Sequence, residues 1–131
     1  MTQPWTTTCF DGKLDAPGEG VPPPRSYGPF PRKLRHDVVA ENVLTIEQAV
    51  HALTGLPATV VRLRDRGAIR VGAMADVAVF DLAAVRDRAT YPHRPPLAAG
   101  KKQVFVNGRL SLVDGQLTDV RAGRVLRRNA P

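Results

Sequence analysis

Two side chains near the start of the chain could do chemistry together. Asp11 follows a β-branched and aromatic run and directly precedes Gly12. A carboxylate at the C-terminal end of a barrel strand is typical of a catalytic group, whereas the alternative is a common Asp-Gly turn. Arg25 follows a run of prolines in a loop that we expect to lie near Asp11. Its guanidinium could bind a substrate carboxylate through two parallel hydrogen bonds, and the simpler interpretation is a surface arginine.

The segments around these residues predict a strand, a loop and a helix. Residues 5–10 favour a strand because they are β-branched or aromatic. Residues 11–29 are rich in Pro and Gly and predict a long loop, and loops of that length are often functional. Pro31 suits the start of a helix, and apolar residues recur at helical spacing over 31–41. In this order of strand, loop and helix, Asp11 stands at the start of the loop, which is where an α/β enzyme places a catalytic group.

Further helices are expected before residue 67. A capping-box pattern begins at Thr45 and predicts a helix over 46–54 that Gly55 ends. A third, short helix is predicted over 57–63, followed by a turn at 65–67.

The second half of the chain predicts antiparallel strands. The apolar run at 77–80 is interpreted as a buried strand. The strongest local signal is a hairpin in which β runs at 103–106 and 109–113 flank Asn107-Gly108, a pair that favours a type I′ turn. Helices followed by hairpins indicate an α+β fold. The other expected segments are a long loop at 86–100, a turn at Asp114-Gly115 and a short last strand at 122–128.

Composition narrows the class of protein. The 131 residues suit one modest core, and 43% hydrophobic and 24% charged content is ordinary for a globular domain. The net charge is +7, but the arginines are scattered and no aromatic residues alternate with them, so we expect no nucleic-acid partner. No apolar run approaches 18 residues, which excludes a membrane span, and no signal-peptide pattern is present. A cytoplasmic location is the expectation.

Metal binding by this chain alone is not expected. The three histidines, His36, His51 and His93, lie far apart and form no H-x-H or H-E-x-x-H spacing. The first two fit helix surfaces and the third a solvated loop. Cys9 is the single cysteine, so no internal disulfide can form.

Several segments, in order, resemble the C-terminal part of the D-aminoacylase group (N-acyl-D-amino-acid deacylases) of the amidohydrolase superfamily. These are "FDG" at 10–12, "PPPRSYGPFPR" at 22–32, "LTIEQAVHALTGLPATVVRLRDRGAIRVGAMADVAVFD" at 44–81, "RDRATYPHRPP" at 86–96 and "QVFVNGRLSLVDGQLT" at 103–118. The resemblance implies a partial fold. Residues 1–66 would hold the last strand, the active-site loop and the helices of a TIM-like barrel. Residues 67–131 would hold the C-terminal strands of a small β-sandwich domain.

The resemblance also implies chemistry. Members of the group are zinc hydrolases that cleave the amide of N-acyl-D-amino acids. Asp11 matches the aspartate that binds or approaches the metal and takes a proton from water, and Arg25 matches a loop arginine that binds the substrate carboxylate. Phe10, Pro23 and Pro29 depart from the Ser, His and Thr of the group's pattern.

Most of the group's metal ligands have no counterpart in this sequence. We therefore expect the isolated chain to bind no zinc and to be inactive, with Asp11 near a metal only if the rest of the barrel is supplied. Two alternatives are a subunit that completes a barrel from a partner chain and a non-enzymatic basic binding module. Unpaired strand edges also favour self-association or marginal folding.

Overall fold

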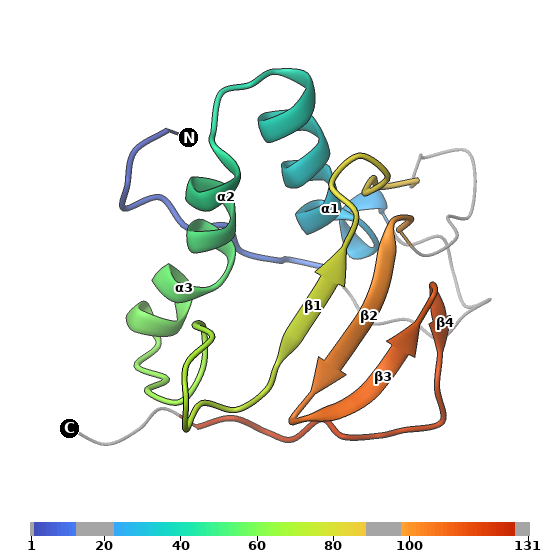
Figure 1. The fold of residues 1–131 in the computed structure, drawn as a ribbon. Coiled ribbons are helices and arrows are strands. Elements are labelled where there is room, and N and C mark those ends of the chain that lie inside the picture. The colour runs from blue at the N-terminus through green and yellow to red at the C-terminus, as the bar shows by residue number, and fades with distance from the viewer. Residues whose placement is uncertain (1, 13–22, 89–97, 128–131) are drawn as a thin grey trace.

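The structure, a computed structural model, describes residues 2–12, 23–88 and 98–127. It consists of a layer of helices beside a four-stranded antiparallel sheet (Figure 1). The helical elements are η1 (Pro24–Ser26), α1 (Pro29–Lys33), η2 (Leu34–Ala40), α2 (Ile46–Leu53) and α3 (Gly55–Val60). The strands are β1 (Val77–Phe80), β2 (Lys101–Val106), β3 (Arg109–Val113) and β4 (Gln116–Leu117). The predicted α+β class is confirmed, whereas the barrel and sandwich assignments stay predictions.

The predicted helix over 31–41 is confirmed as α1 continued by η2. It begins two residues earlier, with Pro29 at its first turn, where a missing N–H costs nothing. η2 has the wider π geometry, and at its end the Glu41 N–H donates to the His36 carbonyl at 2.8 Å, five residues back. The segment therefore forms one helical rod that starts directly after the candidate site loop.

The predicted capping box is confirmed at the start of α2. Thr45 Oγ1 accepts from the Gln48 N–H at 3.3 Å, and Gln48 Oε1 accepts from the Thr45 N–H at 2.9 Å. The prediction that Gly55 ends this helix is wrong, because α2 ends at Leu53 and Gly55 begins α3. Thr54, with φ −131° and ψ −81°, makes the break.

The third predicted helix is shifted rather than absent. It was expected over 57–63, and α3 runs from Gly55 to Val60. Its end is set by Arg62, whose φ of 59° leaves the helical region. A turn at 64–65 follows, as expected near 65–67.

The two predicted turns of the sheet are confirmed. Asn107 and Gly108 have φ values of 49° and 78°, and a type I′ turn needs positive φ at both positions. They join β2 to β3, with Val106 opposite Arg109. Asp114 and Gly115 repeat the pattern between β3 and β4, with φ values of 47° and 81°. The sheet is thus a simple meander in the order β1-β2-β3-β4.

The bounds predicted for β1 are confirmed, but its predicted burial is wrong. Ala78 and Val79 are both exposed. The reason is that β1 is an edge strand, paired with β2 on one side and with no other strand of the described residues on the other. An apolar run alone does not say whether both faces of its strand are covered.

Two predicted strands do not form. The strand predicted over residues 5–10 is absent: Trp5 lies in a turn, and residues 6–10 pair with no strand of the described residues. They contact the end of α2 instead, where the Thr8 N–H donates to the Ala52 carbonyl at 3.3 Å. A strand needs a neighbour, and the described part of the chain offers none here. The last strand, predicted over 122–128, is likewise absent over 122–127, and residue 128 lies outside the described residues. β4 already pairs with the outer edge of β3, and the tail is held by Asn107 Nδ2, which donates to the Ala122 carbonyl at 2.6 Å.

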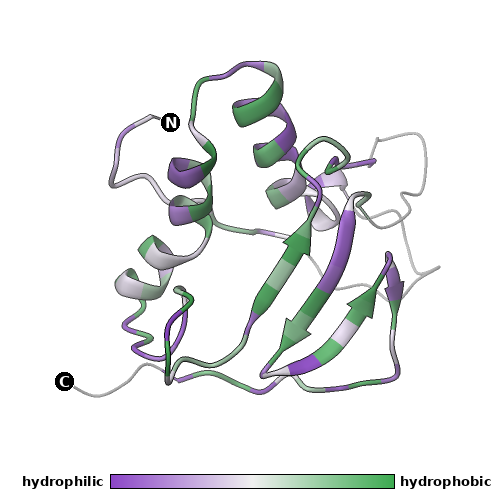
Figure 2. Ribbon diagram, in the orientation of Figure 1, coloured by the Kyte–Doolittle hydropathy of each residue, from purple (hydrophilic) through white to green (hydrophobic). Residues whose placement is uncertain are grey.

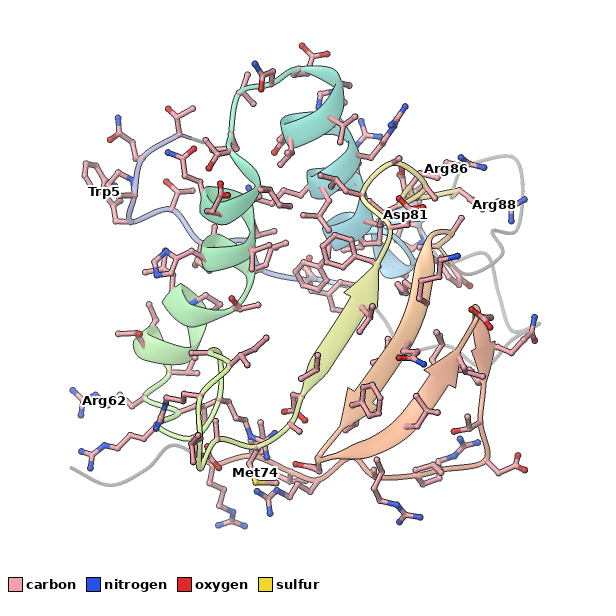
Figure 3. The ribbon with its side chains drawn as sticks, viewed as in Figure 1. Trp5, Arg62, Met74, Asp81, Arg86 and Arg88 are labelled. Atoms are coloured by element: carbon pink, nitrogen blue, oxygen red, sulfur yellow. The ribbon has the colours of Figure 1, made fainter. Side chains whose placement is uncertain are left out.

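The core joins the helices to the segment that follows β1. Leu34, Leu44, Ala49 and Val85 are buried together, and Phe80 packs against them. Figure 3 places Asp81 and Arg86 at this end of β1. Gly100, with φ 83°, lies against the backbone of Val85, where a Cβ would collide with it. Among the described helices, none has the length and apolar content to cross a membrane.

Candidate active-site loop

Asp11 and Arg25 lie in contact, as the sequence predicted. Arg25 Nε donates a hydrogen bond of 2.7 Å to the backbone carbonyl of Asp11, and the same Nε lies 3.9 Å from Asp11 Oδ2. The Asp11 side chain is 95% exposed and that of Arg25 is 59% exposed. The contact thus joins the arginine mainly to the backbone, and it leaves the carboxylate facing solvent.

Close packing holds the two ends of the loop together. A Cβ on Gly12 would lie 2.8 Å from Ser26 Cα and would overlap the ring of Phe10, so only glycine fits between them. The Phe10 ring also packs against Phe30 of α1, with ring centroids 6.3 Å apart. These contacts fix residues 10–12 against the start of the helical layer.

The prolines before Arg25 shape the turn that carries it. Pro23 has φ −64° and ψ 155°, and Pro24 opens the η1 turn. The Ser26 N–H donates to the Pro23 carbonyl at 2.9 Å, which closes the turn around Arg25. Because proline fixes φ in advance, less entropy is lost when this turn orders. The arginine is therefore presented on a stiff support.

The geometry suits recognition of an anion beside a proton acceptor. Arg25 uses Nε for Asp11, while its two terminal nitrogens have no hydrogen-bond partner among the described residues. Those nitrogens can form the paired hydrogen bonds that a carboxylate accepts. The exposed Asp11 carboxylate can accept a proton or join a metal site. Residues 13–22, the rest of this loop, lie outside the described residues.

The described residues do not fit a complete zinc site. Zinc in proteins takes at least three protein ligands, and no cluster of three His, Cys, Asp or Glu side chains occurs in the part of the chain that the structure describes. His36 lies on η2, with Nδ1 3.1 Å from Asp37 Oδ1, and His51 is exposed on α2, as predicted for both. His93 lies outside the described residues.

Sequence reasoning missed a buried arginine at the far end of β1. The Arg66 side chain is only 7% exposed; Nη1 binds Asp76 Oδ2 and Nη2 donates to Asn107 Oδ1 at 2.7 Å. The Asn107 N–H in turn donates to Asp76 Oδ1 at 2.7 Å. We call these three residues, Arg66, Asp76 and Asn107, the clasp. All three lie inside the segments quoted for the resemblance, so that resemblance was the available signal.

Known proteins match this chain along most of its length. The sequence profile described as the amidohydrolase family matches residues 15–118. An N-acyl-D-glutamate deacylase of Alcaligenes xylosoxydans xylosoxydans is 43% identical over 122 residues. A D-aminoacylase of the same organism is 41% identical over 119 residues. These matches cover 93% and 91% of this chain and 25% of each relative.

Solved structures agree with the sequence matches. A D-aminoacylase studied for the role of its binuclear metal centre superposes with a TM-score of 0.85 at 41% identity, over 94% of this chain and 25% of that one. The N-acyl-D-glutamate deacylase of Bordetella bronchiseptica, complexed with zinc and a phosphonate inhibitor, gives a TM-score of 0.81 at 38% identity over 96% and 26%. The chain therefore spans about a quarter of the length of these relatives, and the resemblance to D-aminoacylases is confirmed. It belongs to the amidohydrolase family.

Proposed function

We propose that this chain supplies two working residues of a D-aminoacylase-type amidohydrolase, with N-acyl-D-amino acids as substrates. The observation that carries the proposal is the contact between Arg25 and Asp11 at the joined ends of one loop. The relatives' names support the substrate class, since they include deacylases of N-acyl-D-glutamate and N-acyl-D-aspartate. Both molecules carry a carboxylate next to the amide that is cleaved.

The proposed roles follow from the two side chains. The terminal nitrogens of Arg25 bind the substrate's α-carboxylate and so hold the amide beside Asp11. Asp11 accepts a proton from the water that adds to the amide carbonyl, and returns it to the nitrogen as the carbon–nitrogen bond breaks. The products are a carboxylate and a D-amino acid. The first step needs an ionised Asp11, and the second needs the proton that Asp11 has just taken up. Both steps need the side chain free to turn toward the substrate, which its exposure allows.

In this proposal, a zinc ion would need ligands other than the described residues. A relative binds zinc, but Asp11 alone is one ligand at most and cannot fix a metal. We propose instead that the 131-residue chain is inactive alone and that its two residues work when the other three quarters of a D-aminoacylase surround them.

Activity of the isolated chain tests the first half of this proposal. The chain is assayed with N-acetyl-D-glutamate and N-acetyl-D-aspartate at a saturating Zn²⁺ concentration, and release of the D-amino acid is followed. We expect no turnover above a blank that contains Zn²⁺ without protein. Turnover well above that blank, abolished by Asp11→Asn, would contradict the proposal.

A reconstituted enzyme tests the two roles. The chain is co-expressed with the part of the Alcaligenes N-acyl-D-glutamate deacylase that lies outside the matched quarter. Asp11→Asn should lower kcat by about 10²- to 10⁴-fold, the usual worth of a general base. Arg25→Gln should act mainly through KM. A matched substrate whose α-carboxylate is an amide separates the roles, because Arg25→Gln should matter little for it while Asp11→Asn costs as much as before.

A further inference from the structure

A pocket of about 510 Å³ lies where α3 ends. Its walls come from α3 and from the segment that follows this helix, which carries hydrophilic residues over much of its length (Figure 2). Four of its ten lining residues are arginines, namely Arg62, Arg64, Arg66 and Arg70. We call this hollow the arginine pocket. Neither Asp11 nor Arg25 lines it, so it is separate from the candidate active-site loop.

The charge of this lining is strongly one-sided. The described lining contains four arginines and no aspartate or glutamate. Asp65 is adjacent in the sequence but does not line the pocket, and it lies 3.8 Å from Arg66 Nε and 4.0 Å from Arg124 Nη2. A hollow lined by charges of one sign raises the local concentration of the opposite ion. The pocket therefore favours an anionic ligand.

The exposed arginines of the pocket keep donors available for such a ligand. Arg62 and Arg64 are exposed, and their side chains make no hydrogen bond or ion pair with the described part of the chain. Figure 3 places Arg62 at the end of α3. Arg70 Nη2 donates to the Arg64 backbone carbonyl, which occupies one of the donors of that guanidinium. Each guanidinium carries five donors in a planar fork that matches an oxyanion.

Arg66 adds a buried donor that has no hydrogen-bond partner among the described residues. Its side chain is 7% exposed, and its two terminal nitrogens bind Asp76 and Asn107, which leaves Nε without a bond. A buried donor destabilises the fold unless a protein group, a water or an ion supplies an acceptor. Because Arg66 lines the pocket, an anion seated there can supply this acceptor. The clasp keeps its structural contacts in this arrangement.

The backbone that carries the arginines is held tightly against α3. A Cβ on Gly67, whose φ is 84°, would lie 2.6 Å from Ala58 Cβ and 3.0 Å from the Thr54 carbonyl oxygen. The Leu63 N–H donates to the Ala58 carbonyl at 2.8 Å, and Arg62 has a φ of 59°, which is uncommon outside glycine. A segment fixed in this way loses little further freedom when a ligand binds.

We propose that the arginine pocket binds a phosphate group, either as free phosphate or on a small organic molecule. A phosphate carries nearly two negative charges and three acceptor oxygens, so it can bond several guanidiniums at once. Pockets for small organic ligands have volumes of roughly 300–1,000 Å³, so this one has room for an organic phosphate as well. The inference is independent of the proposed function.

A nucleic acid fits the pocket less well than a small phosphate. Proteins that bind single strands combine a basic groove with aromatic side chains on which the bases stack. The described lining has no aromatic residue, and its arginines surround one hollow rather than a groove. A duplex is therefore included in the experiment as a competing ligand.

Titration of the full chain with phosphates tests the inference. The 131-residue chain is titrated calorimetrically with inorganic phosphate, pyrophosphate and a sugar phosphate, in chloride buffer at constant ionic strength. We expect saturable one-to-one binding, with shifts in the NMR signals of the Arg62 and Arg64 Nε–H groups. Tighter binding of the sugar phosphate than of inorganic phosphate would assign the site to organic phosphates, and the reverse order to free phosphate.

Matched substitutions separate a built site from general attraction. Arg62→Gln and Arg64→Gln should each weaken phosphate binding about tenfold, because each removes a charged donor. Arg35→Gln removes the same charge from an exposed position on η2 outside the pocket, and it should leave the affinity within about threefold because salt screens distant charges. Urea unfolding without phosphate checks that the variants fold alike. Asp11→Asn should bind phosphate normally, so failure of the catalytic proposal would leave this result intact.

Four outcomes would overturn the inference. The first is the absence of saturable binding by any of the three phosphates. The second is equal weakening by Arg35→Gln and Arg62→Gln, which would indicate diffuse attraction to a chain of net charge +7. The third is tighter binding of N-acetyl-D-glutamate than of any phosphate through the same arginines. The fourth is tighter binding of a DNA duplex than of pyrophosphate, with equal losses in all three arginine variants.

Discussion

Of the arginines that lie close to an aspartate, Arg66 and Arg25 have completely different surroundings. Arg66 is 7% exposed, and its guanidinium is bound by Asp76 and Asn107. Arg25 is 59% exposed and touches mainly the backbone of an aspartate whose own side chain is 95% exposed. The first pair joins distant segments of the chain, and the second joins the two ends of one loop.

The difference matches the two proposed roles, a structural charge for Arg66 and a ligand-binding charge for Arg25. A buried guanidinium must have its hydrogen bonds satisfied within the protein, or its desolvation destabilises the fold. Arg66 nearly meets that requirement, because only its Nε lacks a hydrogen bond. Asp65 Oδ1 lies 3.8 Å from this Nε, which is close enough for an ion pair but too far for a hydrogen bond. Asp11 and Arg25 stay solvated and keep free bonding capacity for a ligand. Predictions about stability should therefore centre on the clasp, and predictions about catalysis on the loop.

The largest loss of stability is expected for Arg66→Ala. It leaves Asp76 and Asn107 without their shared donor and releases the segment after α3 from the β2–β3 turn. Breaking a buried pair costs about 3–5 kcal/mol, and the partial exposure of Asp76 reduces this to roughly 2–3 kcal/mol in the free energy of unfolding. Urea unfolding measures it. Arg66→Lys should fall in between, because an ammonium keeps the charge but lacks the planar group whose two terminal nitrogens each bind one partner.

Arg35→Ala is the matched control for that loss. Arg35 is an exposed arginine on η2, and its removal should change the free energy of unfolding by less than about 0.5 kcal/mol. If Arg66→Ala were no worse than this control, the clasp would not hold the two segments together, and the distinction drawn between the two arginines would fail.

Local signals in the sequence predicted the two turns of the sheet and the start of α2 well, though not the end of α2 at Gly55, since each of these successful predictions depends on a few adjacent residues. Asn107-Gly108 specifies its turn by backbone conformation alone, and Thr45 with Gln48 specifies the start of α2. Arg66 could not be placed in the same way. Its partners lie 10 and 41 residues away, and the residue types by themselves resemble a solvated arginine in a turn.

The next largest effect is expected for Gly12→Ala. The added Cβ would lie 2.8 Å from Ser26 Cα and would overlap the Phe10 ring. Residues 10–12 and the turn that contains Ser26 would therefore have to move apart. Overpacking of this kind costs about 1–3 kcal/mol, and the lower end applies because Phe10 is partly exposed and can rotate. Urea unfolding measures the cost, and the NMR signal of the Arg25 Nε–H should shift as its bond to Asp11 lengthens.

Gly123→Ala is the control for this substitution, since a Cβ there meets no atom within 4 Å. An unchanged Arg25 Nε–H signal in Gly12→Ala would mean that glycine is not what closes the loop. The contact of Asp11 with Arg25 was predicted from a strand that does not form, but the Pro-held turn that carries Arg25 is a short-range feature and is present. The glycine's tight packing was not predicted, since it depends on the side chain of Phe10.

A smaller effect of opposite sign is expected for Lys101→Met. Burial lowers the pKa of Lys101 from its usual value of 10.5, so the folded state binds its proton less tightly than the unfolded state does. Below the lowered pKa the folded chain bears the cost of a desolvated charge, and that cost fades as the pH rises toward 10.5. Lys101→Met should therefore raise Tm at pH 7, with a gain that shrinks toward pH 10. Lys102→Met, on an exposed neighbour, should show no such trend.

The smallest effects on the free energy of unfolding are expected for the two substitutions at the proposed site, which should have the largest effects on catalysis. Asp11→Asn and Arg25→Gln alter exposed side chains, and the Nε–backbone bond of Arg25 can be replaced by the amide of glutamine. Neither variant should move the urea midpoint of the isolated chain measurably, although both should impair the reconstituted enzyme. A large loss of stability in Asp11→Asn would place this carboxylate with Asp76 as a structural group. It would also remove the physical reason for treating the loop as a site, because a carboxylate committed to the fold has no capacity left for substrate or metal.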